Sequence, residues 1–300
     1  MNPPILRHLA NLWTFMGHPT KAAEWSLDQK LAAIKLAGFD GICWAGSPEL
    51  RDGCRRHGLI FVGGMVSGNA ADFPRLLQEQ KDCGAVHVNV QLAADDLPTP
   101  KALELALALN REGQRIGVAP AIETHRGTCT ETPEKHYALC DAYEKVTGEL
   151  LQVSFDFSHF AVVKHLLPED FSKRLLVRPG LIRRAQQFHF RPFNGHHVQV
   201  PITDGHGNLT SEVKDWLPFA EAWLKCWLVG NCDTDREIFI CPELGPVTGG
   251  YALSTFPNSW EEAKVLRGEI EKLWHKLTGQ VSVRADRAWQ QFATHVKLIP

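Results

Sequence analysis

The chain has 300 residues, a length that suits one large domain or two small ones. Hydrophobic residues make up 44% of the chain and charged residues 22%, as in an ordinary globular protein. The formal net charge is −2 and no segment concentrates Lys and Arg, so a nucleic-acid partner is not expected.

Short apolar or β-branched runs alternate with longer amphipathic stretches along the chain. The short runs predict strands at residues 9–16, 39–44, 59–66, 85–92, 118–123, 151–156, 185–191 and 237–243. The longer stretches carry apolar residues at three- and four-residue spacing and predict helices at residues 27–37, 100–116, 133–146, 211–228 and 258–277. Thr132, Ser211 and Asn258 are the expected N-caps of the last three helices.

Eight strand–helix units predict a single closed parallel barrel, the (β/α)₈ TIM barrel, over residues 1–280. An open doubly wound sheet is the alternative, but neither a G-x-G-x-x-G turn nor a Walker A loop is present. Residues 281–300 follow the eighth unit and are expected to form a helical extension packed on the barrel. The loop at 191–210 is longer than most loops of a compact domain, so we expect it to have a functional role.

Eight cysteines occur without any C-x-x-C pair, and a chain of this length does not need a disulfide framework. We therefore expect reduced, mostly buried thiols. The N-terminus lacks the basic and apolar regions of a signal peptide, and no run of about 18 apolar residues exists. These features predict a cytoplasmic protein without a membrane partner.

Side-chain parity in the later strands separates apolar residues from polar ones. Successive strand residues point to opposite faces, and in a barrel one face meets the helices while the other points inward. The inward parity of strands five to eight ends in Glu123, Asp156, His189 and Glu243, and that of strand four ends in Gln91. Because the carboxyl ends of barrel strands form the active-site rim, we expect these side chains to converge there.

Three carboxylates in one partly dry pocket repel one another unless a cation neutralises them. Mostly oxygen ligands with one imidazole suit Mn²⁺, Mg²⁺ or Co²⁺ better than a structural zinc ion. Glu123, Asp156, His189 and Glu243 are thus expected to hold one divalent metal ion. The alternative is that each acid merely ends a strand or pairs with a surface base.

Four motifs match a known family in the same order: AIETHRGT (121–128), SFDFSH (154–159), FHFRP (188–192) and CPELGP (241–246). The chain resembles the xylose isomerase-like TIM-barrel superfamily, in particular the sugar isomerase/epimerase group that includes D-tagatose 3-epimerase and hydroxypyruvate isomerase. The resemblance implies a Mn²⁺-type ion on the four residues and a sugar or keto-polyol (cyclitol) substrate. It also implies that Glu123 and Glu243 move a proton through an enediolate, whereas Asp156 and His189 only hold the ion.

The resemblance also suggests substrate contacts. His159 matches the family's substrate-contacting histidine, although it could instead orient Asp156. His125 points inward by parity and is expected to contact substrate or to pack its loop. Arg191 follows His189 by only two residues, closer than the arginine of the family's epimerases. The next loop, with His196 and His197, departs from the family pattern, and His197 competes with His189 as a metal ligand.

Aromatic residues near the strand tips could form an apolar wall for a sugar, or could simply pack in the core. They are Trp13, Phe15, Trp44 and Tyr251. Relatives of this kind are often dimers or tetramers, so a homo-oligomer is compatible with the resemblance, but no interface is visible in the sequence.

Three other functions remain open on the same fold. An inosose dehydratase-type lyase would expel a hydroxyl after enolisation. An endonuclease IV-like nuclease would use three zinc ions, for which Asp204 and His206 form an Asp-x-His pair, but further histidines are missing and the chain is not basic. A non-catalytic binding barrel without metal is the third alternative. Loss of metal-ligand residues would argue for it, but all four are present.

Overall fold

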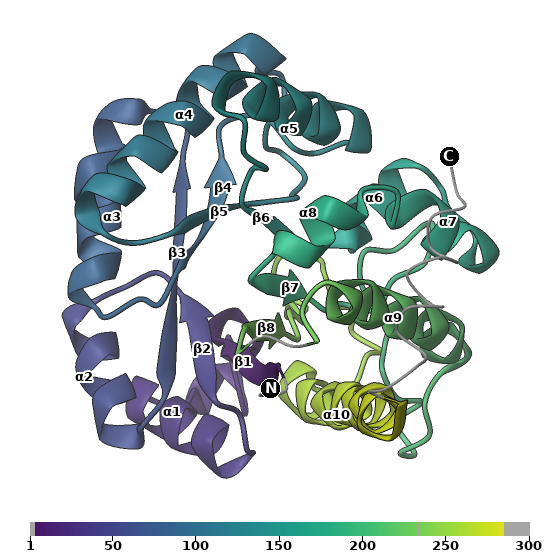
Figure 1. The fold of residues 1–300 in the computed structure, drawn as a ribbon. Helices are drawn as coiled ribbons and strands as arrows, with labels where there is room; N and C mark the ends of the chain where they lie inside the picture. Colours follow the sequence, from purple (N-terminus) through teal and green to yellow (C-terminus); the bar gives the residue numbers. More distant parts are fainter. Residues whose placement is uncertain (1–3, 233–234, 285–300) are drawn as a thin grey trace.

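The computed structural model describes residues 4–232 and 235–284. Within them eight parallel strands close into a barrel in chain order, which confirms the predicted (β/α)₈ architecture (Figure 1). The strands are β1 (Ile5–Asn11), β2 (Gly41–Trp44), β3 (Ile60–Ser67), β4 (Val88–Leu92), β5 (Pro120–Glu123), β6 (Val153–Phe155), β7 (Gln187–His189) and β8 (Glu237–Cys241).

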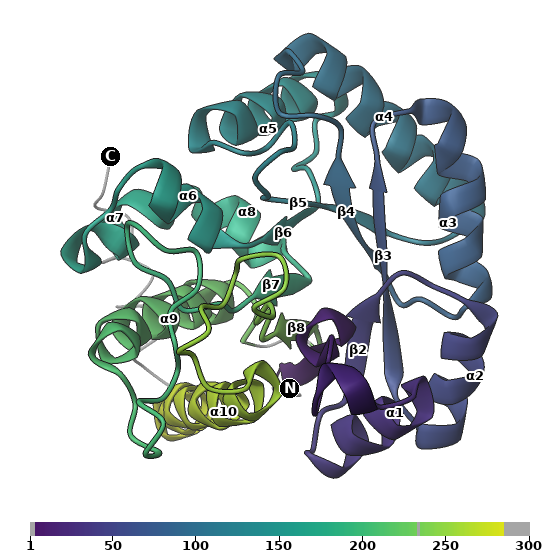
Figure 2. The same cartoon turned by 180° about the vertical axis from the view of Figure 1, so that it is seen from behind.

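Helices surround the barrel on the outside, as the views from both sides show (Figures 1 and 2). They are α1 (Leu27–Leu36), α2 (Pro48–His57), α3 (Phe73–Asp82), α4 (Thr99–Ile116), α5 (Pro133–Thr147), α6 (Phe157–Val163), α7 (Phe171–Leu175), α8 (Pro179–Arg184), α9 (Ser211–Val229) and α10 (Ser259–Arg284). Among the described helices, none is both long enough and apolar enough to cross a membrane.

The N-caps explain where three of these helices begin. The Thr132 side chain accepts a hydrogen bond from the Lys135 amide, and Asn258 accepts from the amides at the start of α10, as predicted. For α9 the prediction was wrong by one residue, because Thr210 rather than Ser211 caps the helix.

The first predicted strand is the main error. Strand β1 ends at Asn11, and the apolar residues that follow form a 3₁₀ turn, η1 (Leu12–Phe15). The Asn11 side chain accepts from the Trp13 amide and so starts this turn, while Leu12 and Phe15 are buried three residues apart. At the other end, α10 continues to Arg284, and residues 285–300 of the predicted extension lie outside the described residues.

Two hydrophobic layers follow the predicted strand parity. A small inner cluster fills the barrel, and a much larger one joins the outer strand faces to the helices. The inner cluster consists of Leu9, Cys43, Val62, Phe239 and Cys241. Toward the carboxyl ends of the strands, the inward side chains are polar. The polar residues that could form an active site therefore lie at this rim of the barrel.

His136 on α5 makes stability depend on pH. Its buried ring packs against Phe155 and Phe160, with ring centroids 5.7 Å away in both cases. Burial, with a smaller effect of Arg178, lowers the His136 pKa from 6.5 to about 3. The unfolded chain therefore binds this proton first as the pH falls. The contribution of His136 to stability is complete above pH 6.5 and is lost progressively as the pH falls toward 3.

We expect the free energy of unfolding to fall by about 1.4 kcal/mol per pH unit from this group between pH 6 and pH 4. His136→Leu should flatten that slope in urea titrations at several pH values, whatever it does to stability at neutral pH. His275→Leu is the control, because the His275 side chain is 73% exposed. Equal slopes in wild type and His136→Leu would contradict this assignment.

Candidate metal and substrate site

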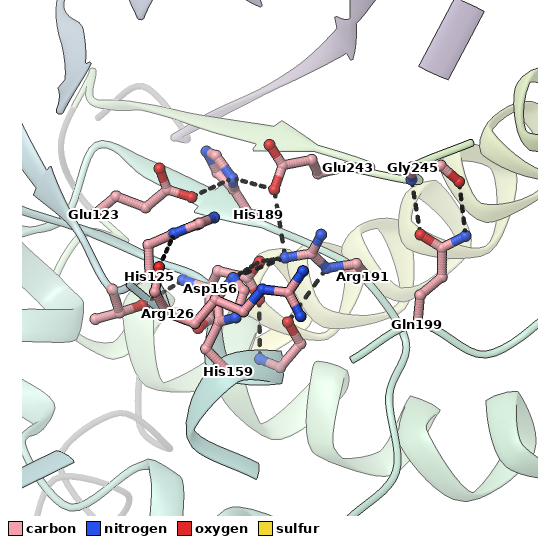
Figure 3. Close-up of polar contacts among 12 residues, drawn as sticks. Glu123, His125, Arg126, Asp156, His159, His189, Arg191, Gln199, Glu243 and Gly245 are labelled. Atoms are coloured by element: carbon pink, nitrogen blue, oxygen red, sulfur yellow. Dashed lines mark hydrogen bonds and ion pairs between the residues drawn. The ribbon is translucent and has the colours of Figure 1, made fainter. Parts of the chain in front are cut away.

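Four potential metal ligands meet at the carboxyl rim of the barrel. Glu123 ends β5, Asp156 follows β6, His189 ends β7, and Glu243 lies two residues beyond β8. All four are buried, and each offers a ligand atom within 4.8 Å of those of the others (Figure 3). The cluster could therefore bind one divalent metal ion.

Local backbone contacts fix Asp156 in this position. Its amide donates to Thr124 Oγ1 at 2.7 Å, and that hydroxyl donates to the Asp156 carbonyl at 3.0 Å. Its carboxylate oxygen Oδ1 also accepts from the Ser158 amide at 2.9 Å and caps α6. The second oxygen, Oδ2, contacts Arg191 Nη2 and lies 3.5 Å from His159 Nε2.

The unsatisfied atoms of the cluster fit a cation. Glu123 Oε1 is buried without a hydrogen-bond partner and lies 3.2 Å from His189 Nδ1. The same imidazole nitrogen lies 3.0 Å from Glu243 Oε2. Carboxylate oxygens with unused lone pairs around one imidazole nitrogen are a donor set that Mn²⁺ or Mg²⁺ accepts.

Neighbouring positive charges keep the carboxylates of Glu123 and Asp156 ionised. Burial alone would raise the pKa of Glu123, but His189 outweighs it and the Glu123 pKa lies well below its usual value. Burial also opposes the charge of Asp156, yet Arg191 lowers the pKa of that carboxyl. For His189, burial is outweighed by Glu243 and Glu123, which hold its pKa well above 6.5. A metal ion would therefore have to displace a proton from His189.

Arg191 lies inside the cluster. Its Nη2 contacts Asp156 Oδ2 and lies 3.5 Å from Glu243 Oε2, while Nε donates to Ser158 Oγ at 3.2 Å. The side chain is fully buried, and its predicted role as a substrate contact stays a prediction. Its Nη1 is the one guanidinium nitrogen without a partner among the described residues.

Two asparagines, which the sequence did not single out, hold the two glutamates. Asn89 Nδ2 donates to Glu123 Oε2 at 2.7 Å, and Asn11 Nδ2 donates to Glu243 Oε1 at 3.0 Å. Inward parity was the available signal for Asn89. Asn11 was missed because the first strand was predicted at residues 9–16, so its actual end at Asn11 was not recognised. Each asparagine leaves the other carboxylate oxygen of its glutamate free to face the centre of the cluster.

A chain of polar contacts crosses the barrel beneath His189. His87 Nε2 lies 2.7 Å from Gln187 Oε1, and Gln187 Nε2 lies 2.6 Å from His189 Nε2. Burial lowers the His87 pKa to about 4, so His87 is neutral near pH 7. Because this chain engages Nε2 of His189, Nδ1 is the nitrogen presented to the carboxylates.

We expect Gln187→Met to weaken Mn²⁺ binding roughly 10- to 100-fold, because His189 loses the partner that holds the orientation of its ring. Calorimetric titration of the metal-free protein measures this. Gln78→Met on the exposed face of α3 is the control. Unchanged Mn²⁺ affinity in Gln187→Met would show that the contact does not orient His189.

A cavity of about 240 Å³ opens beside the cluster on the side of β1 to β4. His189 and Glu243 border it, and its remaining lining is Asn11, Cys43, Trp44, Ala45, Gly64, Met65, Val66, Asn89 and Gln91. Gln91 and Trp44 thus line this cavity, and their role as substrate contacts stays a prediction. Phe15 does not, because it is buried against Trp260 with ring centroids 4.3 Å apart.

The remaining predicted contacts lie on the opposite side of the cluster. His159 is buried with Nε2 3.0 Å from Arg191 Nη2, and burial lowers its pKa to about 3. The half-buried His125 ring lies 4.4 Å from that of His159. Tyr251 meets Trp13 edge-on at 4.5 Å, above Gly245, where a Cβ atom would come within 2.4 Å of the Trp13 ring.

The long loop after β7 is tied to the loop after β8. The Gln199 side chain exchanges two hydrogen bonds with the Gly245 backbone, at 2.7 and 3.2 Å (Figure 3). His197 is exposed and contacts Asn194 instead of the cluster. His196 is exposed too, and Asp204 accepts from the His206 amide within a surface turn. In the described ranges the only grouping of three or more metal-ligand residues is the four-residue cluster, which gives no support to His197 or to a three-zinc site.

Comparison with solved structures identifies the fold. A D-allulose 3-epimerase from Methylomonas sp., solved with D-allulose, matches 91% of this chain and 98% of its own at 14% identity and a TM-score of 0.56. A xylose isomerase-like TIM barrel protein from Mycobacterium smegmatis, solved with magnesium, matches 93% and 97% at 15% identity and a TM-score of 0.53. A probable 3-DHS dehydratase from Bacillus anthracis matches 88% and 99% at 14% identity, also at 0.53.

No family model matches the sequence, and no curated protein matches it significantly. The chain therefore shares the (β/α)₈ TIM-barrel fold of these structures, as its motifs indicated. Several of the solved structures that share this fold are sugar epimerases, among them an L-ribulose 3-epimerase at 15% identity.

Proposed function

We propose that this protein is a divalent-metal-dependent isomerase or epimerase of a ketose or keto-polyol, acting by proton transfer through an enediolate. The observation that carries the proposal is the pair Glu123 and Glu243. Both carboxylates are buried at the rim, on β5 and after β8, and each lies close to the same nitrogen of His189. Mn²⁺ is the expected ion, with Mg²⁺ and Co²⁺ as alternatives.

A C–H bond next to a carbonyl is a poor acid, so its proton transfer needs both a placed base and stabilisation of the developing charge. A divalent ion held by Glu123, Asp156, His189 and Glu243 would supply that stabilisation as a Lewis acid. One glutamate removes the proton from one face of the substrate, and the other returns a proton to the opposite face. Asn89 and Asn11 orient these two carboxylates.

The test is incubation of the protein with ketoses and inososes in D₂O. We expect deuterium next to the carbonyl without loss of water, detected by NMR and mass spectrometry. Absence of exchange with every substrate, in protein shown to contain metal, would refute the proposal.

A lyase of the dehydratase type is the second candidate, favoured by the fold shared with the 3-DHS dehydratase. His159 supports it, because its buried Nδ1 has no partner among the described residues and could serve a leaving hydroxyl. A dehydrated product in the same experiment would establish this reaction instead.

A further inference from the structure

Two arginines approach one aromatic ring beside the metal cluster. The guanidinium carbon of Arg126 lies 4.4 Å from the centroid of Tyr251, and that of Arg191 lies 5.0 Å from it. Arg126 comes from the loop after β5 and Arg191 from the segment after β7, and both approach the rim near Asp156 (Figure 3). The ring of Tyr251 therefore contacts two guanidinium groups, which come from the segments after two different strands.

The loop that carries Arg126 is firmly held. Thr130 Oγ1 donates to the Glu123 carbonyl at 2.6 Å, and Thr128 Oγ1 donates to the His125 carbonyl at 2.7 Å. Both threonines are buried. Gly127 supplies the left-handed turn with φ of 69°, which a side chain would strain. These contacts hold the backbone of the loop at Arg126 next to the end of β5.

Neither arginine is fully satisfied by the protein. The Arg126 guanidinium is exposed, and no carboxylate among the described residues forms an ion pair with it. Arg191 Nη1 is buried without a partner, and so is Nδ1 of His159, whose other ring nitrogen lies 3.0 Å from Arg191 Nη2. The charge balance of the site also leaves Arg126 without a partner. A divalent ion and Arg191 together would balance the three carboxylates of the cluster. Arg126 then adds a positive charge that nothing in the described site neutralises.

We propose that Arg126 and Arg191 form a subsite for an anionic group of the substrate, a carboxylate or a phosphate. Guanidinium groups bind both through paired N–H donors. The cavity on the other side of the cluster has no Lys or Arg in its lining and suits an uncharged end. The proposal rests on the proposed function, since it assumes that the reacting carbonyl lies at the cluster between these two regions.

Three compounds of one skeleton test it: neutral D-fructose, its carboxylate D-fructuronate, and D-fructose 6-phosphate. Binding to the Mg²⁺-loaded protein is measured by calorimetry, with inorganic phosphate as a probe that needs no sugar skeleton. We expect at least one anionic sugar to bind roughly tenfold or more tightly than D-fructose. The tighter of the two identifies the anionic group.

Arg126→Gln should remove this preference and weaken phosphate binding, while D-fructose affinity and metal content stay unchanged. Arg111→Gln, an exposed arginine on α4, makes the same change in net charge and should have no effect. Equal affinities for all three sugars, or anion binding that Arg126→Gln leaves intact, overturns the subsite. These experiments measure binding and not turnover. They therefore test the anion subsite even if no deuterium exchange is found and the isomerase proposal is refuted.

Discussion

Glu123→Gln and Glu243→Gln should each slow deuterium exchange roughly 10²- to 10⁴-fold, the contribution of a positioned general acid or base. Glutamine keeps the size of the side chain and its contact with Asn89 or Asn11, so the fold should persist. It cannot accept a proton from carbon. The exchange rate in D₂O measures the effect, and thermal unfolding reports on the fold.

Both glutamates are also proposed ligands, so the two variants must be assayed at saturating Mn²⁺ with the bound metal measured. Glu131→Gln is the matched control, because Glu131 follows the same strand but pairs with Lys135 at the surface. Full exchange activity in either site variant, with metal bound, would remove that residue from the acid/base pair.

Metal removal should have the second large effect. Treatment with EDTA is expected to reduce turnover to background, and Mn²⁺, Co²⁺ or Mg²⁺ should restore it at about one equivalent per chain. The metal should also stabilise the fold, by about 2.7 kcal/mol at a free concentration of 100 Kd. Elemental analysis, activity and the shift in thermal unfolding are the measurements.

Asp156→Asn should weaken metal binding in the same assays, since it removes a charged ligand but neither member of the acid/base pair. Asp141→Asn, at an exposed ion pair with Arg178, is the control. Undiminished turnover in excess EDTA would contradict metal dependence, and three zinc ions per chain would favour the nuclease alternative.

The sequence predicted the barrel well because strand parity and helical spacing are local patterns. Both survive in the structure, where the inward and outward residues of β5 to β8 separate as expected. The first strand failed for a physical reason. An apolar run such as Leu12–Phe15 suits a strand or a buried turn equally, and the Asn11 side chain decides between them.

The candidate cluster could be located for a similar reason: a closed barrel brings the ends of all its strands to one rim. Contacts across the rim could not be predicted. The link between His87 and Gln187 joins strands on different sides of the barrel. The burial of Arg191 depends on the direction of a long side chain, which periodicity does not specify.

The buried Arg191 also bears on how the protein would acquire a metal ion. Without a cation, three ionised carboxylates would repel one another at the rim, but Arg191 and a protonated His189 already offset most of that repulsion. For a divalent ion to bind here, His189 would have to release its proton and Arg191 would have to give up part of its contact with Asp156. Metal loading would then be an exchange reaction at this rim.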